Sequence, residues 1–409
     1  ERVSYAADWQ ARRAALAAAF AARPEPDPAI EAWLAEAGEP LHLFAVHQAL
    51  SDRLGPYWAA WPAVFRDPRA PEVQAFARAH PGDVRFHAWL QWQAETQLGD
   101  AAAAARAAGM RHGLYLDLAV GTHPHGAETW AHPDIFARGV SLGAPPDAFS
   151  AEGQRWNLAP LDPERLGAAG LHHLAATLRA QLRFAGMLRI DHVLGFERSF
   201  WVPEGLPGAY VAMPREALLA VARIEAARAG AVIVGEDLGN IPEGLDAALA
   251  RSGLLGCRVA QFERAGEQPR PAARYPEGVL ASWGTHDLPT WAGWRQGRDV
   301  AARARLGQVT DAAAAQAARA AEVAAFDAVA GTADGSAEAL HRFLAATPAR
   351  LVAVQAEDAL GVADQPNLPG TTTEYPNWQQ RLPVGAEDLA QADGLRRAAD
   401  IMGQAGRKE

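Results

Sequence analysis

The chain has 409 residues, and its hydrophobic fraction of 49% and charged fraction of 21% are those of an ordinary globular protein. Its formal net charge of -10 argues against nucleic acid or an anionic membrane as the main partner. A single cysteine, Cys257, rules out an internal disulfide and favours a cytoplasmic location, and no apolar run approaches the ~20 residues that span a bilayer.

Residues 1 to about 108 are predicted to be helical. Alanine-rich stretches at 9–22 and 101–108 contain strong helix formers. No stretch before residue 108 has the pattern of a strand that could begin a barrel. We therefore predict a helical subdomain over 1–108, followed by a catalytic core over 109–409.

From residue 110 onward, short apolar runs alternate with helical stretches. That alternation is typical of a parallel sheet or barrel, so the predicted fold class is α/β. The apolar runs lie at 113–120, 186–192, 231–237, 279–287 and 351–355, and helices are predicted at 172–183, 215–229, 244–252 and over most of 300–346.

Four carboxylates lie at or near the ends of these apolar runs: Asp117, Asp191, Glu236 and Asp287. In a parallel barrel the carboxyl ends of the strands face one cleft, so the four side chains should converge. A buried charge is costly unless it is used or paired. Four such residues at successive strand ends therefore indicate an active site.

Breaking a glycosidic bond requires a set of this kind. One acid protonates the leaving oxygen and one carboxylate attacks the anomeric carbon, and the two are ~5–5.5 Å apart in retaining enzymes. Arg189 lies two residues before Asp191, on the same strand face, and its charge would favour the ionised form of that carboxylate. Glu236 follows an aliphatic run, where desolvation would raise its pKa, as suits a general acid.

Several segments resemble the signature sequences of the 4-α-glucanotransferases, the amylomaltase or disproportionating-enzyme family (glycoside hydrolase family 77, related to the α-amylases). The likeness covers nearly the whole chain and is closest to the bacterial maltodextrin-pathway members. It implies a (β/α)8 TIM-type barrel with helical insertions, one of which is 1–108. The segments are Arg189-Ile-Asp-His192, Gly235-Glu-Asp-Leu-Gly239, Gly284-Thr-His-Asp287, Gly126-Ala-Glu-Thr-Trp130, Gly143-Ala-Pro-Pro-Asp147, Gly153-Gln-Arg-Trp156 and Asn367-Leu-Pro-Gly-Thr-Thr-Thr-Glu-Tyr-Pro-Asn-Trp378.

The resemblance implies retaining transfer of α-1,4-glucan segments between maltooligosaccharides, amylose or related glucans. Asp191 would be the nucleophile that forms a covalent glucosyl-enzyme. Glu236 would act first as the general acid and then as the base. Asp287 would stabilise the transition state through sugar hydroxyls. The resemblance implies no cofactor and no catalytic metal.

It also implies a set of substrate-binding residues. Arg189 would orient Asp191, His286 would assist Asp287, and Asp117 would be an acid on an earlier barrel strand. Asp147, Gln154 and Trp156 would line the donor subsites, and the loop at 367–378 would shape the rim. His192 is a further candidate, with packing or a backbone hydrogen bond as its alternative role.

Two other enzyme classes remain open at this point. A metal-dependent hydrolase could use the pairs Asp191-His192, Glu236-Asp237 and His286-Asp287 as ligands. Adjacent residues on a strand point to opposite faces, however, so only one residue of each pair could easily bind the same metal ion. A simple α-glucan hydrolase would share the covalent intermediate and differ only in accepting water.

Other conspicuous residues have ordinary structural explanations. Asp237 is expected to cap the following turn. Four histidines lack convincing ligand partners and are expected to have no catalytic role, and three tryptophans are expected in the core more than as sugar platforms. These residues are His123, His125, His172, His173, Trp283, Trp291 and Trp294.

Members of the family carry, ahead of the region matched here, a segment with the first barrel strand and a Pro-Tyr-rich stretch. No such segment is found in this sequence, which opens with Glu1-Arg2-Val3. We therefore expect the first strand of the barrel to be absent from this chain. This expectation keeps a third alternative open, an inactive barrel that binds glucan without converting it.

Overall fold

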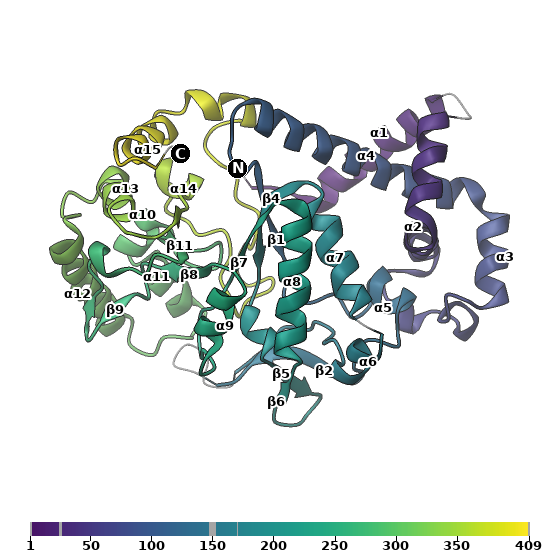
Figure 1. Ribbon diagram of the computed structural model, residues 1–409, viewed down its shortest axis with the longest axis horizontal. Helices are drawn as coiled ribbons and strands as arrows, with labels where there is room; N and C mark the ends of the chain where they lie inside the picture. The colour runs from purple at the N-terminus through teal and green to yellow at the C-terminus, as the bar shows by residue number, and fades with distance from the viewer. Residues whose placement is uncertain (1, 24–26, 147–152, 170, 408–409) are drawn as a thin grey trace. The chain divides into compact units, whose positions relative to one another are not determined.

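A computed structural model describes residues 2–23, 27–146, 153–169 and 171–407 (Figure 1). The chain forms two compact units: a larger unit, Trp9–Leu254, and a smaller unit, Glu1–Asp8 with Leu255–Glu409. The main division between the two units lies between Leu254 and Leu255. The boundary expected from the sequence, between residues 108 and 109, remains a prediction. Within the described ranges, no helix is both long and apolar enough to cross a membrane.

The predicted helical character of the first hundred residues is confirmed. Asp27 caps the second helix by accepting a hydrogen bond from the Ala29 N–H, and Pro28 occupies its first turn, where no N–H is needed. Helices α2 and α4 pack side by side (Figure 1), joined by a hydrogen bond of 2.9 Å from Trp33 Nε1 to Glu95 Oε1. The helices are α1 (Tyr5–Ala22), α2 (Pro28–Leu54), α3 (Pro71–Ala79) and α4 (Pro81–Ala107), with short 3-10 turns at Trp58–Ala60 and Ala63–Phe65.

A three-stranded parallel sheet forms the core of the larger unit, in the order β1-β4-β7. Helices α7 and α8 pack together and cover the sheet with leucines such as Leu178 and Leu219, which are fully buried. Three of the predicted strands and all three predicted helices of this region are confirmed. The elements are β1 (Leu114–Leu118), α5 (Ala127–Ala131), α6 (Pro163–Ala168), α7 (His172–Leu182), β4 (Ala185–Ile190), α8 (Arg215–Ala229), β7 (Val232–Gly235) and α9 (Leu245–Arg251).

A second, antiparallel sheet in the larger unit was not predicted. Its order is β3-β2-β5-β6, with β2 and β5 in register from Val140 opposite Pro203 to Gly143 opposite Phe200. Gly143 is required there, because a Cβ at this position would lie 2.1 Å from the Gln154 carbonyl oxygen. The strands are β2 (Val140–Ala144), β3 (Gln154–Arg155), β5 (Arg198–Pro203) and β6 (Ala209–Ala212), and the 3-10 turn Val193–Phe196 precedes β5.

The smaller unit contains a second parallel sheet, in the order β12-β11-β8. Strands β11 and β12 and the helices within 300–346 are as predicted, whereas β8 was missed. The elements are β8 (Gly256–Val259), β9 (Arg264–Ala265), β10 (Gln268–Pro269), the 3-10 turn Ala272–Arg274, β11 (Val279–Ser282), α10 (Trp291–Arg295), α11 (Arg298–Arg305), α12 (Ala312–Ala330), α13 (Ala337–Ala345), β12 (Leu351–Val352), α14 (Ala356–Ala359), the 3-10 turn Ala386–Gln391 and α15 (Asp393–Gln404).

Aromatic side chains dominate the core of the smaller unit. Trp283, at the end of β11, meets Trp291, Trp294 and Phe326 edge-on, with ring centroids 4.8, 5.0 and 5.3 Å apart. All four side chains are buried. The prediction that Trp283, Trp291 and Trp294 are core residues is therefore confirmed.

Replacing Trp283 should destabilise the protein strongly. We expect Trp283→Ala to lower the free energy of unfolding by ~3–5 kcal/mol, the usual cost of truncating a buried tryptophan. Trp378, which is 48% exposed, is the matched control, and Trp378→Ala should cost under about 1 kcal/mol. Guanidinium unfolding of both variants measures the difference, and equal midpoints would contradict a structural role for Trp283.

Candidate active site

The register of the β1-β4-β7 sheet brings four ionisable side chains to the carboxyl ends of its strands. Asp117 on β1 lies opposite Arg189 on β4, and Ile190 lies opposite Gly235 on β7. Asp191 and Glu236 each follow one of these paired strand ends, and the Glu236 N–H donates to the Ile190 carbonyl at 2.9 Å. The predicted convergence of Asp117, Asp191 and Glu236 at neighbouring strand ends is thus what the backbone produces in the larger unit.

Arg189 bridges two of these acids. Its Nη1 lies 2.8 Å from Asp117 Oδ1, and its Nη2 lies 2.7 Å from Asp191 Oδ1. Burial lowers the pKa of the Arg189 guanidinium, but the charge of Asp191 and the hydrogen bond and charge of Asp117 outweigh burial, so the pKa is raised overall. The guanidinium therefore stays charged and holds the Asp191 carboxylate in a fixed direction, as the two-residue spacing predicted.

Glu236 lies in a different environment from Asp191. It is buried, and its two carboxyl oxygens accept hydrogen bonds from the His192 N–H at 2.8 Å and the Leu238 N–H at 2.9 Å. Burial raises the pKa of Glu236 to about 7; the Asp191 charge adds to this rise, whereas Arg189 and the two backbone bonds oppose it. The protonated form of Glu236 therefore persists up to about pH 7, as general-acid chemistry requires.

His192 has a positioning contact with Glu236 through its backbone. Its φ is +48°, a left-handed conformation that non-glycine residues seldom adopt, and it is this residue whose N–H meets the Glu236 carboxylate. Burial lowers the pKa of the His192 ring, which favours its neutral form. The His192 and Trp156 rings meet edge to face, with 5.3 Å between their centroids. Trp156 Nε1 donates a hydrogen bond to Gln154 Oε1 at 3.0 Å.

A cavity of about 210 Å³ lies beside these residues, and all of its walls belong to the larger unit. Asp191, His192 and Trp156 line it together with Glu128 and His173. The last two form a pair, with His173 Nε2 at 2.6 Å from Glu128 Oε1. His173 was predicted to have no catalytic role, and its carboxylate partner was not predicted. The only sequence signal was that Glu128 lies inside the motif 126–130.

Asp287 and His286 belong to the smaller unit and lie in the loop that follows β11. His286 Nε2 lies 3.5 Å from Asp287 Oδ2, and the His286 ring contacts the Trp378 indole at 5.2 Å between centroids. Asn367 Nδ2 donates a hydrogen bond to Asp287 Oδ1. The sequence predicted only that residues 367–378 shape a rim, so Asn367 as a direct partner of Asp287 is an addition.

Two further residues from the sequence analysis are Asp147 and Asp237. Asp147 lies outside the described residues. Asp237 is buried beside Glu236. In the part of the chain that the structure describes, no group of three or more histidine, cysteine, aspartate or glutamate side chains is arranged to hold a metal ion.

Comparison with known proteins gives a consistent result. A family model described as 4-alpha-glucanotransferase matches residues 1–387. The 4-alpha-glucanotransferase of Mycobacterium tuberculosis is 41% identical over 402 residues, covering 93% of this chain and 55% of that protein. The Haemophilus influenzae protein of the same name is 34% identical, covering 86% and 54%. The chain therefore spans about half the length of these relatives.

Solved structures agree on the fold. Amylomaltase from Corynebacterium glutamicum matches with a TM-score of 0.84 and 32% identity, covering 98% of this chain and 60% of that one. Amylomaltase from Streptococcus agalactiae, solved in complex with acarbose, matches with a TM-score of 0.81 and 20% identity, covering 100% and 81%. The predicted α/β barrel class is confirmed, and the chain belongs to the 4-alpha-glucanotransferase family, glycoside hydrolase family 77.

Proposed function

We propose that this protein transfers segments of α-1,4-glucan between maltooligosaccharides, or to and from amylose, by a retaining double displacement. The observation that carries the proposal is the contrast between two acids at neighbouring strand ends. Asp191 is held by a guanidinium at 2.7 Å, whereas burial raises the pKa of Glu236 to about 7. One ionised and one protonated carboxyl group are what glycosidic bond cleavage requires.

In the first step, Glu236 donates its proton to the glycosidic oxygen while an Asp191 oxygen attacks the anomeric carbon. The C–O bond to the leaving glucan breaks as the bond to Asp191 forms, which gives a covalent glucosyl-enzyme and releases a glucan with a free hydroxyl. In the second step, the ionised Glu236 takes the proton of an acceptor hydroxyl. The acceptor oxygen then displaces Asp191, and the two inversions together retain the configuration.

The other charged residues support these two steps. Arg189 orients Asp191 and balances its negative charge in the free enzyme, and Asp117 accepts hydrogen bonds from the other terminal nitrogen, Nη1, at 2.8 and 2.9 Å. Asp287, oriented by Asn367, binds sugar hydroxyls as the ring flattens toward an oxocarbenium ion. Gln154, Trp156 and His192 bind the donor sugar, and His286 assists Asp287.

The proposal includes a cytoplasmic site of action and no cofactor. The single cysteine, Cys257, which is buried, supports this location. The proton transfers described above use side chains of the chain itself, so no step calls for a bound group. Activity that survives exhaustive chelation is the corresponding expectation.

The decisive measurement is product analysis with maltotriose as the sole substrate. Transfer gives glucose or maltose together with oligomers longer than maltotriose, because a sugar hydroxyl competes with water for the glucosyl-enzyme. Products that are all shorter than maltotriose would identify a hydrolase instead. A protein that binds maltotriose and gives no product would contradict both enzymatic readings.

A further inference from the structure

The loop that carries His286 and Asp287 is held by side chains from both neighbouring strands of its sheet. Strand β11 is the middle strand of the order β12-β11-β8, and the loop follows it. Gln261 follows β8 and Gln355 follows β12, so the two glutamines lie at the carboxyl ends of the strands, where the loop begins. The proposed catalytic steps use neither glutamine.

Both glutamines donate hydrogen bonds to backbone carbonyls of this loop. Gln261 Nε2 lies 3.0 Å from the Pro289 carbonyl oxygen, and Gln355 Nε2 lies 3.4 Å from the Thr285 carbonyl oxygen. One of these carbonyls comes before Asp287 in the chain and the other comes after it. The backbone is therefore tied down on both sides of the acid.

The glycine at position 284 allows both amides to approach the loop. A Cβ on Gly284 would lie 2.9 Å from Gln261 Nε2 and 3.2 Å from Gln355 Oε1. A side chain at this position would therefore push the two amides away from the carbonyls that they bind. The first residue of the motif 284–287 thus has a physical role in the arrangement.

The two carbonyls do not need these amides as donors. The Thr285 carbonyl also accepts the Leu288 N–H at 3.1 Å, and the Pro289 carbonyl also accepts from Trp283 Nε1 at 3.3 Å. Gln355 Oε1 is buried and has no donor among the described residues, which is unfavourable for stability. An apolar side chain of the same length would avoid that penalty. Stability therefore does not account for the glutamine, whereas the position of the loop does.

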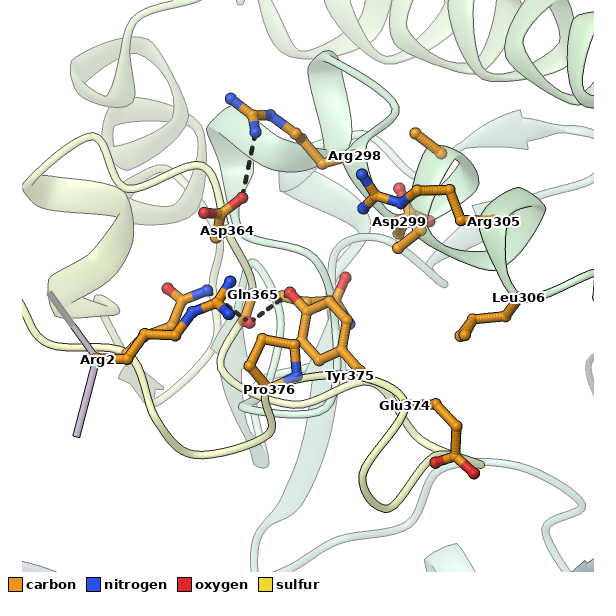
Figure 2. Close-up of a pocket in the computed structure, with 13 residues that line it drawn as sticks. Arg2, Arg298, Asp299, Arg305, Leu306, Asp364, Gln365, Glu374, Tyr375 and Pro376 are labelled. Carbon is orange, nitrogen blue, oxygen red and sulfur yellow. Dashed lines mark hydrogen bonds and ion pairs between the residues drawn. The ribbon is translucent and has the colours of Figure 1, made fainter. Parts of the chain in front are cut away.

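Asp287 is also held by a segment that is itself fixed. Asn367 Nδ2 donates a hydrogen bond to Asp287 Oδ1. Figure 2 shows part of this segment along the wall of a cavity, where the Tyr375 hydroxyl donates to the Gln365 carbonyl oxygen at 3.0 Å. A shift of the loop at 284–289 would therefore move the carboxylate relative to its asparagine partner.

We propose that Gln261 and Gln355 are positioning residues, which hold the Asp287 carboxylate where it meets the sugar hydroxyls. This inference rests on the proposed function, in which Asp287 binds these hydroxyls as the ring flattens. Because that contact is strongest in the transition state, a displaced carboxylate lowers kcat more than it raises KM. A displacement of about 1 Å is enough to cost about a hundredfold in rate.

Gln261→Met and Gln355→Met test the proposal, because methionine keeps the length of the side chain and removes the donor. With maltotriose as the substrate, each variant should lower kcat at least about tenfold and change KM less than about threefold. The melting temperature should stay within about 4 °C of the wild-type value, since each carbonyl keeps its other donor. Gln316→Met is the matched control and should leave kcat unchanged, because Gln316 Nε2 makes a bond of the same kind, at 3.0 Å, to the Gln296 carbonyl beyond α10.

A double-mutant comparison separates positioning from a general loss of structure. Adding Gln355→Met to the wild-type protein should slow the formation of the glucosyl-enzyme from α-maltosyl fluoride about tenfold. Adding it to Asp287→Asn should slow the same reaction less than about twofold, because the amide acts through the Asp287 carboxylate. Equal slowing in both backgrounds would identify a merely structural amide and overturn the assignment. Equal kcat values for Gln316→Met and the two loop variants would overturn it as well.

A structural readout tests the positioning role apart from catalysis. His286 Nε2 lies 3.5 Å from Asp287 Oδ2 and the His286 ring meets the Trp378 indole, so the NMR signal of this ring reports the position of the loop. In protein that contains isotope-labelled histidine, the signal, identified with His286→Asn, should move in both loop variants and stay in place in Gln316→Met. A signal that does not move would overturn the positioning role even if the wild-type protein transfers glucan. Failure of the wild-type protein to transfer from maltotriose would contradict the proposed function, and a moved signal would still support the positioning role.

Discussion

Asp191→Asn should reduce glucan transfer from maltotriose by at least about a thousandfold while the protein remains folded. An amide is a poor nucleophile, so the covalent glucosyl-enzyme cannot form at a useful rate. The ion pair with Arg189 is also lost, but Asp117 still holds that guanidinium at 2.8 Å. Because Asp191 is partly exposed, the free energy of unfolding should change by about 1 kcal/mol or less.

Asp162→Asn provides a matched control for this variant. Asp162 lies in the same unit and caps α6 by accepting the N–H groups of Glu164 and Arg165 at 3.0 and 3.2 Å. Asparagine caps a helix about as well as aspartate does, so both activity and stability should stay near those of the wild-type protein. Oligosaccharide analysis and thermal unfolding measure the two effects. Transfer by Asp191→Asn at more than a tenth of the wild-type rate would rule out the nucleophilic role.

The sequence predicted the parallel strands β1, β4, β7, β11 and β12, because each lies within a short apolar run. The period-two spacing also predicted the contact between Arg189 and Asp191, which the structure has at 2.7 Å. Pairing of neighbouring strands then follows from the alternation of strands and helices. These features depend on local sequence, so a single chain is enough to predict them.

Other parts of the structure depend on contacts between distant residues. Strand β8 includes Arg258, which interrupts its apolar run and hides the strand pattern. The antiparallel sheet forms because Gly143 allows the Gln154 carbonyl to approach within a distance that excludes a side chain. Asn367 reaches Asp287 across 80 positions in the sequence, and His173 reaches Glu128 across 45. No local pattern predicts pairs of this kind.

Glu236→Gln should separate proton donation from nucleophilic attack. Glutamine has no proton to donate, so transfer from maltotriose should fall by about 10²–10⁴-fold, the usual contribution of a general acid. Formation of the glucosyl-enzyme from α-maltosyl fluoride should fall less than about tenfold, because fluoride leaves without protonation. Glu164→Gln, an exposed substitution on α6, is the control and should leave both reactions unchanged.

The pH dependence gives an independent readout. Because burial raises the pKa of Glu236 from 4.5 to about 7, the protonated acid is present in the folded protein below that pH and is lost above it. The wild-type kcat/KM on maltotriose should therefore fall as the pH rises through about 7, and this alkaline limb should be missing from Glu236→Gln. If kcat/KM fell with the same pKa in both proteins, the proton would belong to another group.

The same variant should also identify the nucleophile. In the second step Glu236 acts as the base, so Glu236→Gln should form the glucosyl-enzyme from the fluoride and then release it slowly. Mass spectrometry of the quenched protein should show an added maltosyl group, and the peptide that carries Asp191 should contain it. Neither Asp191→Asn alone nor the double variant should show the adduct, since both lack the attacking carboxylate. An adduct on any other peptide would contradict the assignment of Asp191 and Glu236 as a pair, because the two predictions depend on one covalent intermediate.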